Sequence, residues 1–162
     1  MSALKYLMTV LVLLWSFVPL PGEAADIKTH LEVEDLLHRH AEAYAKKDLQ
    51  SIMSLFATDP EVMLVIGGAH QARYVGQAQI RESYEADFAA TTSAAMKHNW
   101  VSVRSKGDLA WFASECLSTV EIEKQKLVFP VLWTGLVEKR DNSWVFVQCH
   151  VSIPMPESRE GQ

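Results

Sequence analysis

The chain has 162 residues, of which 49% are hydrophobic and 22% charged, and its formal net charge at pH 7 is −5. This composition is typical of a globular protein, and the length suits one domain of roughly 100 to 150 residues behind a short leader. A negatively charged chain that has no run of basic residues lacks the cations that neutralise phosphates. We therefore expect no nucleic acid partner.

The N-terminus has the features of a secretory signal peptide. Lys5 supplies a positive charge, residues 7–18 are almost entirely apolar, and the small residues Ala24 and Ala25 follow two prolines. The apolar run is shorter than the roughly 20 residues that a membrane-spanning helix needs. We therefore expect residues 1–24 to be removed on export, no permanent membrane anchor, and a periplasmic or secreted mature protein. An uncleaved anchor is the alternative.

Apolar residues at helical spacing predict three helices in the first part of the mature chain. The first starts at a capping box of Thr29 and Glu32, the second is capped by Asp48, and the third opens at Gly76. The residues expected on their buried faces are, in turn, Val33, Leu36, Leu37, His40 and Tyr44; Leu49, Ile52, Met53 and Phe56; and Ile80, Tyr84 and Phe88.

From residue 98 onward the pattern alternates, which predicts strands. The domain is expected to span residues 25–154, and a loosely ordered tail follows at 155–162. Helices followed by an antiparallel meander indicate an α+β fold in which the helices cover one face of the sheet. The predicted strands are a short one at 61–66 and four longer ones at 98–105, 109–122, 127–139 and 144–153.

The two cysteines, Cys116 and Cys149, fall in the second and fourth of the longer strands. An exported protein can form disulfides. In a meander, however, these residues would lie two strand spacings apart, roughly 9 to 10 Å, which is beyond the reach of a disulfide. We therefore expect two free thiols.

Five short sequence motifs are informative when taken together: 44–49 (YAKKDL), 55–57 (LFA), 74–81 (YVGQAQIR), 107–111 (GDLAW) and 144–152 (WVFVQCHVS). Their order and spacing resemble the SnoaL-like branch of the nuclear transport factor 2-like superfamily. The resemblance implies a cone, in which a strongly curved antiparallel sheet and about three helices enclose a pocket. It also implies frequent pairing as a homodimer through the outer face of the sheet. The fold serves enzymes, binding proteins and assembly modules alike, so it specifies no reaction.

Similarity to the ketosteroid isomerase and polyketide cyclases of this superfamily implies a general base on the first strand, where those enzymes use an aspartate. The matching residue here is Leu64, which cannot carry a proton. The sequence offers three substitutes, His150, His40 and Asp87. Histidine is suited to the role because it titrates near neutral pH.

The two histidines are predicted to reach the pocket from different elements. His40 lies one helical turn from Tyr44, so both can face the cavity. His150 is expected to share a strand face with Phe146 and Gln148, because residues two apart point the same way. The alternatives are hydrogen-bonded core histidines and, for the third candidate, a solvated or ion-paired Asp87.

The residues expected to contact a ligand are largely aromatic or apolar. For the tryptophans a role in the core or at an interface is the alternative. The predicted set is Tyr44, Leu64, Tyr84, Trp100, Phe112, Trp133 and Gln148.

The leading hypothesis is a domain that binds a small, largely apolar molecule, with or without isomerase-like or lyase-like proton transfer. We expect no metal and no cofactor, because the sequence has neither paired Cys or His ligands nor a glycine-rich phosphate loop. The competing hypothesis is a non-catalytic module for dimerisation or protein interaction, whose pocket is filled by its own side chains.

Overall fold

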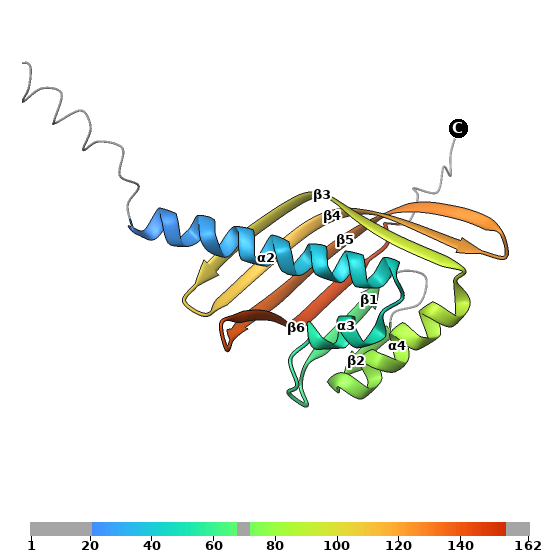
Figure 1. The fold of residues 1–162 in the computed structure, drawn as a ribbon, viewed down its shortest axis with the longest axis horizontal. Coiled ribbons are helices and arrows are strands. Elements are labelled where there is room, and N and C mark those ends of the chain that lie inside the picture. Colours follow the sequence, from blue (N-terminus) through green and yellow to red (C-terminus); the bar gives the residue numbers. More distant parts are fainter. Residues whose placement is uncertain (1–20, 68–71, 155–162) are drawn as a thin grey trace, which may run out of the picture.

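The computed structural model describes residues 21–67 and 72–154 of the chain (Figure 1). The signal peptide predicted at residues 1–24 lies mostly outside the described residues, and the tail at 155–162 lies wholly outside them. Helices and strands follow in the order α2 (Pro21–Ala45), α3 (Leu49–Ser54), β1 (Met63–Gly67), β2 (Ala72–Val75), α4 (Gly76–Ala90), β3 (Ser93–Lys106), β4 (Leu109–Ile122), β5 (Gln125–Arg140) and β6 (Ser143–Ser152).

The first helix begins at Pro21, not at Thr29. Proline is well tolerated in a first turn, because the N–H that it lacks would have no intrahelical partner there. The predicted capping box is also wrong. The Glu32 carboxylate instead accepts hydrogen bonds from Lys139 Nζ at 2.8 Å and Trp144 Nε1 at 2.9 Å, and it thereby ties α2 to β5 and β6.

The other two helices begin where the sequence predicts. Asp48 caps α3 by accepting a hydrogen bond from the Ser51 backbone N–H at 3.0 Å. Gly76 opens α4 with a φ of 78°, a conformation that glycine adopts at little steric cost. Among the helices in the described part of the chain, none is long and apolar enough to cross a membrane. The predicted inner faces are buried, including Val33, Leu36, Leu37, Ile52, Met53, Ile80 and Tyr84.

The strands form one curved six-stranded sheet in the order β2-β1-β6-β5-β4-β3 (Figure 1). The α+β fold class is confirmed, and β3 to β6 form the expected meander. The sheet is mixed rather than wholly antiparallel, because β1 pairs with β6 in parallel. The four-residue strand β2 was not predicted, since it is too short to show an alternating pattern.

A bulge in β6 decides which way its last residues point. Leu136 pairs with Gln148 but the next residue, Val137, pairs with Phe146, so Val147 is an extra residue in the ladder. Phe146 is therefore buried on the inner face, whereas Gln148 and His150 are exposed on the outer face. The prediction that Phe146, Gln148 and His150 share one face is wrong for this reason.

A second bulge in β3 acts in the same way. The register shifts between His98 and Trp100, which leaves Asn99 as the extra residue. His98 and Val103 face the helices, and Trp100 is exposed on the outer face of the sheet. The two bulges lie in strands at opposite sides of the meander, and together they set the composition of both faces.

The core lies between the helices and the inner face of the sheet, with α2 running across the strands (Figure 1). Trp133 and Phe146 are its largest fully buried side chains. Cys116 on β4 and Cys149 on β6 are buried with β5 between them, and both thiols are free as predicted.

Candidate functional site

A cavity of about 330 Å³ is lined by α2, α4 and the inner face of the sheet. Most of its lining side chains are apolar, and the sheet contributes residues from β1, β3, β4, β5 and β6. Its volume is at the lower end of the range for small-molecule sites, roughly 300 to 1,000 Å³. Six residues predicted for the site line this cavity: His40, Tyr44, Leu64, Tyr84, Asp87 and Trp133.

His40 and Tyr84 form the innermost polar pair of the cavity wall. His40 is only 3% exposed, and its Nε2 lies 2.7 Å from the Tyr84 hydroxyl. Its Nδ1 is buried without a hydrogen-bond partner among the described residues. Because an orphaned buried N–H is rarer than an orphaned acceptor, this arrangement favours the tautomer in which Nε2–H donates to Tyr84. The Tyr84 hydroxyl proton is then free to donate into the cavity.

Burial keeps this pair uncharged. Loss of solvation lowers the pKa of His40 to about 3, with a smaller contribution from His98. Burial likewise raises the pKa of Tyr84 well above its usual value. Trp133 packs edge-on against the His40 ring, with 4.7 Å between the ring centroids, and helps to exclude water from it. At neutral pH the pair therefore presents a neutral hydrogen-bond donor.

Tyr44 and Asp87 form the second polar pair. The Tyr44 hydroxyl donates to Asp87 Oδ2 at 2.6 Å. Burial and the neighbouring carboxylate raise the pKa of Tyr44, so it remains a phenol. The bond holds a carboxylate at the wall of a largely apolar cavity, where it can accept a proton or a hydrogen bond from a ligand.

The two pairs cross from α2 to α4 one helical turn apart. His40 and Tyr44 are four residues apart on α2, and Tyr84 and Asp87 are three apart on α4, so each set lies on one helix face. The His40 and Tyr44 rings stack with an interplanar angle of 10°. A donor, Tyr84, and an acceptor, Asp87, thus lie side by side along the same wall.

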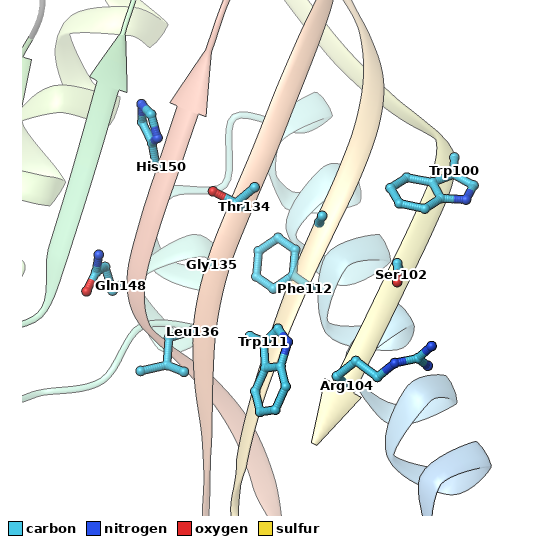
Figure 2. A pocket seen from close by; sticks show the side chains of 11 residues that line it. Trp100, Ser102, Arg104, Trp111, Phe112, Thr134, Gly135, Leu136, Gln148 and His150 are labelled. Atoms are coloured by element: carbon cyan, nitrogen blue, oxygen red, sulfur yellow. The ribbon is translucent and has the colours of Figure 1, made fainter. Parts of the chain in front are cut away.

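Three of the other predicted site residues lie on the opposite face of the sheet. Trp100, Gln148 and His150 border a shallow outer groove of about 660 Å³, as Figure 2 shows. Phe112 is only 3% exposed and packs on Trp133 in the core. Its ring also reaches the floor of the groove, which it lines. The structure therefore does not bring these four residues into the inner cavity.

A polar cluster next to the cavity was missed in the sequence. His98 Nδ1 lies 2.8 Å from Ser114 Oγ and 3.2 Å from Cys116 Sγ, across paired strands β3 and β4. Burial raises the pKa of the Cys116 thiol, so this is not an activated cysteine. No spacing signal could have revealed the cluster, because the bulge in β3 determines that His98 faces inward.

Metal binding finds no support in the part of the chain that the structure describes. Within residues 21–67 and 72–154, no three His, Cys, Asp or Glu side chains are close enough to hold a metal ion. His38 is exposed and His40 buried, so these neighbours on α2 point to different sides.

Solved structures of several proteins have the same fold. A nuclear transport factor 2-like superfamily protein from Salmonella enterica is 19% identical, with a TM-score of 0.72, over 83% of this chain and 98% of that chain. A Novosphingobium aromaticivorans protein provisionally named scytalone dehydratase is 12% identical, with a TM-score of 0.71, over 84% and 91% of the two chains. Another protein from that organism, provisionally named aromatic ring hydroxylase, is 20% identical, with a TM-score of 0.73, over 80% and 92%. At these identities the likeness shows the fold alone.

No curated protein matches the chain in sequence. The family model of the SnoaL-like domain matches residues 33–156, which is well over half of the chain. The match covers α2 from Val33 onward, the other two helices, the meander and both polar pairs of the cavity. The chain therefore belongs to the SnoaL-like domain family, as the sequence motifs predict.

Proposed function

We propose that the domain binds a small, largely apolar organic molecule in the inner cavity and moves a proton on it. The observation that carries this proposal is an apolar cavity whose wall holds a neutral donor, Tyr84, beside a carboxylate, Asp87. Convergent polar groups in an otherwise apolar cavity are typical of sites that orient one small ligand. The provisional names dehydratase and hydroxylase among structurally similar proteins agree with chemistry in this fold.

Asp87 is the proposed base. Tyr44 holds its carboxylate in place, and Tyr84 would donate a hydrogen bond to a carbonyl oxygen of the ligand. A proton would pass from the carbon next to that carbonyl to Asp87, and the Tyr84 hydroxyl would stabilise the resulting enolate oxygen. If the ligand is a β,γ-unsaturated ketone, return of the proton to the γ-carbon moves the double bond into conjugation and completes an isomerisation. His40 acts as a positioning residue, because it fixes the Tyr84 hydroxyl.

This arrangement places the base on a helix instead of on the first strand. Leu64 on β1 contributes an apolar surface to the same cavity. The isomerases that the sequence resembles carry an aspartate at the matching position. The proton would therefore be taken from the side of the ligand that faces α4.

Hydrogen–deuterium exchange tests the proposal without a known substrate. The protein is incubated in D₂O with a panel of neutral ketones, and deuterium entering next to the carbonyl is followed by mass spectrometry. We expect catalysed exchange with at least one ketone. Asp87→Asn should slow it by roughly 10²-fold to 10⁴-fold, the usual contribution of a general base.

His150→Gln is the matched control, because His150 lies on the outer face and does not line the cavity. It should leave exchange unchanged. Exchange that survives Asp87→Asn would remove this residue as the base. If no ketone exchanges and none raises the melting temperature, both binding and chemistry are contradicted.

A second proposal concerns the outer face of the sheet, where the chain would pair with a second copy. The observation that favours it is a set of large apolar side chains exposed on this face. Aromatic residues are enriched at protein interfaces, and a paired sheet would cover them. The exposed set is Trp100, Leu109, Trp111, Leu117 and Leu132.

Export also remains a proposal. It is supported by Lys5, the apolar run at residues 7–18 and the small residue Ala24. N-terminal sequencing of the protein recovered from the periplasm or medium should find a chain that starts near Ala25. A product that starts at Met1 would contradict cleavage.

A further inference from the structure

The inner cavity opens at one end between apolar side chains. Four of the described residues that line it are also exposed: Ile122 at 37%, Leu127 at 45%, Ile153 at 36%, and Ala90 at the end of α4. Ile122 and Leu127 flank the turn of the β4–β5 hairpin, and Ile153 follows β6. A lining residue that is also exposed marks an opening, so the mouth lies at this hairpin and is bordered by apolar groups.

The cavity is elongated from this mouth toward the core. Alternate residues of β5 line it in a row, from Leu127 through Phe129 and Val131 to Trp133. At about 3.3 Å per residue this row extends over roughly 20 Å. A volume of about 330 Å³ spread along such a row makes a narrow channel, not a round chamber. Its shape suits an extended chain better than a fused ring system.

The deepest polar groups lie away from the mouth. Trp133, at the inner end of the row, packs on His40, and His40 contacts Tyr84. Asp87 lies on α4 between buried Tyr84 and exposed Ala90, about one helical turn from each. A molecule with one polar end would therefore place that end inside and direct its apolar part toward the hairpin.

The charge of the wall decides which polar end is accepted. Asp87 is the one acidic or basic side chain besides His40 among the residues that line the cavity in the described part of the chain. A carboxylate or phosphate would be repelled by Asp87, and no Lys or Arg side chain among the described residues lines the cavity. The nearby Lys47 ammonium donates instead to the backbone oxygens of Phe88 and Thr91. The polar end of the ligand is therefore uncharged.

We propose that the cavity takes a neutral single-chain amphiphile, such as a long-chain alcohol, aldehyde or ketone, with its oxygen at Tyr84 and Asp87 and its alkyl tail leaving through the hairpin mouth. This inference rests on the proposed function, because it names the ligand class of the same cavity. It adds that the ligand is a single chain, that it carries no charge, and that its polar end lies inside while its tail leaves through the mouth.

Binding of 1-hexanol, 1-octanol, 1-decanol and decanoate to the full chain, measured by titration calorimetry at pH 8, tests the proposal. Each added CH₂ that is buried should raise the affinity by roughly fourfold. Decanoate should bind at least tenfold more weakly than 1-decanol. Asp87→Asn should narrow that difference, because it removes the charge and keeps the shape.

Leu127→Ser tests the mouth and should weaken 1-decanol more than 1-hexanol, since the longer tail extends further toward the hairpin. Its matched control is Val128→Ser, a similarly exposed position on the same strand that does not line the cavity. Both changes are on exposed side chains, so the comparison does not depend on a core substitution.

The outcomes separate the two proposals. If the compact neutral probe 1-naphthol binds more tightly than 1-decanol and affinity does not rise with chain length, the amphiphile is wrong while ligand binding stands. Equal binding of decanoate and 1-decanol to the unmodified protein would also overturn it. If 1-naphthol and every alcohol fail to bind, the proposed function falls as well.

Discussion

The two faces of the sheet carry cavities of opposite character. The inner one is a largely apolar cavity with two hydrogen-bonded polar pairs, and the outer one is a shallow groove bordered by Trp100, Arg104, Trp111 and His150 (Figure 2). Polar groups inside have fixed partners, whereas those outside are exposed to water. Desolvation strengthens electrostatic interactions, so the inner face is the better place for proton transfer and the outer face for association.

Two single-residue bulges produce this division. At Asn99 and Val147 an extra residue reverses the alternation of the strand, so His98 and Trp100 point to opposite sides although they are two apart. Without the bulge in β6, His150 would face the cavity. The chemistry of each face is thus decided at two residues that themselves line neither pocket.

Replacing one tryptophan on each face should give the largest contrast. Trp133 is 1% exposed in the core, whereas Trp111 is 49% exposed on the outer face. Trp133→Ala should lower the free energy of unfolding by about 3 to 5 kcal/mol, because it leaves a cavity. Trp111→Ala should change it by about 0.5 kcal/mol or less in the monomer. Urea unfolding of both variants checks this, and similar midpoints would contradict the assignment of faces.

A smaller loss of stability is expected on replacing Gly135 in β5. A Cβ built there would lie 2.6 Å from the Phe112 ring and 2.8 Å from the Gln148 carbonyl oxygen. Gly135→Ala should therefore cost about 1 to 3 kcal/mol in overpacking. The exposed neighbour Thr134→Ala serves as the control. If chemical denaturation finds Gly135→Ala as stable as the native protein, Phe112 does not pack against this strand.

The sequence predicted most of the fold and part of the inner site. Helical spacing identified His40 and Tyr44 as inward-facing, and the strand predicted at 109–122 coincides with β4. These predictions succeed because burial imposes a regular period on the chain. They are local and need no knowledge of which strands are neighbours.

The predictions failed where the period is interrupted. Neither Asn99 nor Val147 stands next to a glycine or proline that would mark a bulge, so alternation was carried through both and placed His150 with Phe146. The parallel pairing of β1 with β6 and the Tyr44–Asp87 bond depend on contacts distant in sequence. Such contacts follow from three-dimensional packing, which a single sequence does not display.

The buried His40 on the inner side should make the stability of the protein sensitive to acid. Burial lowers the pKa of His40 from 6.5 to about 3, so the unfolded chain binds a proton that the folded chain excludes. Stability from this group is complete above pH 6.5 and falls as the pH drops toward 3, by at most about 1.4 kcal/mol per pH unit. His98 is shifted in the same direction and adds to the loss.

His40→Gln should reduce this slope between pH 7 and 5, a window chosen to lie above the titration of most carboxyl groups. Gln keeps a donor for the Tyr84 oxygen but does not titrate. Denaturation at several pH values compares His40→Gln with the native protein, and an unchanged slope would show that His40 is not held neutral by burial.

The smallest effect on the folded monomer is expected from a charge placed on the outer face. Trp111→Glu should alter the free energy of unfolding of the monomer little, because the side chain is already exposed. In the proposed homodimer the same charge would be buried without a partner, which strongly disfavours association. Light scattering should therefore show a dimer for the native chain and a monomer for the variant, while 1-decanol binding to the inner cavity persists. Loss of both dimerisation and 1-decanol binding in Trp111→Glu would mean that a change on the outer face alters the inner cavity. A monomeric native protein would contradict the proposed homodimer.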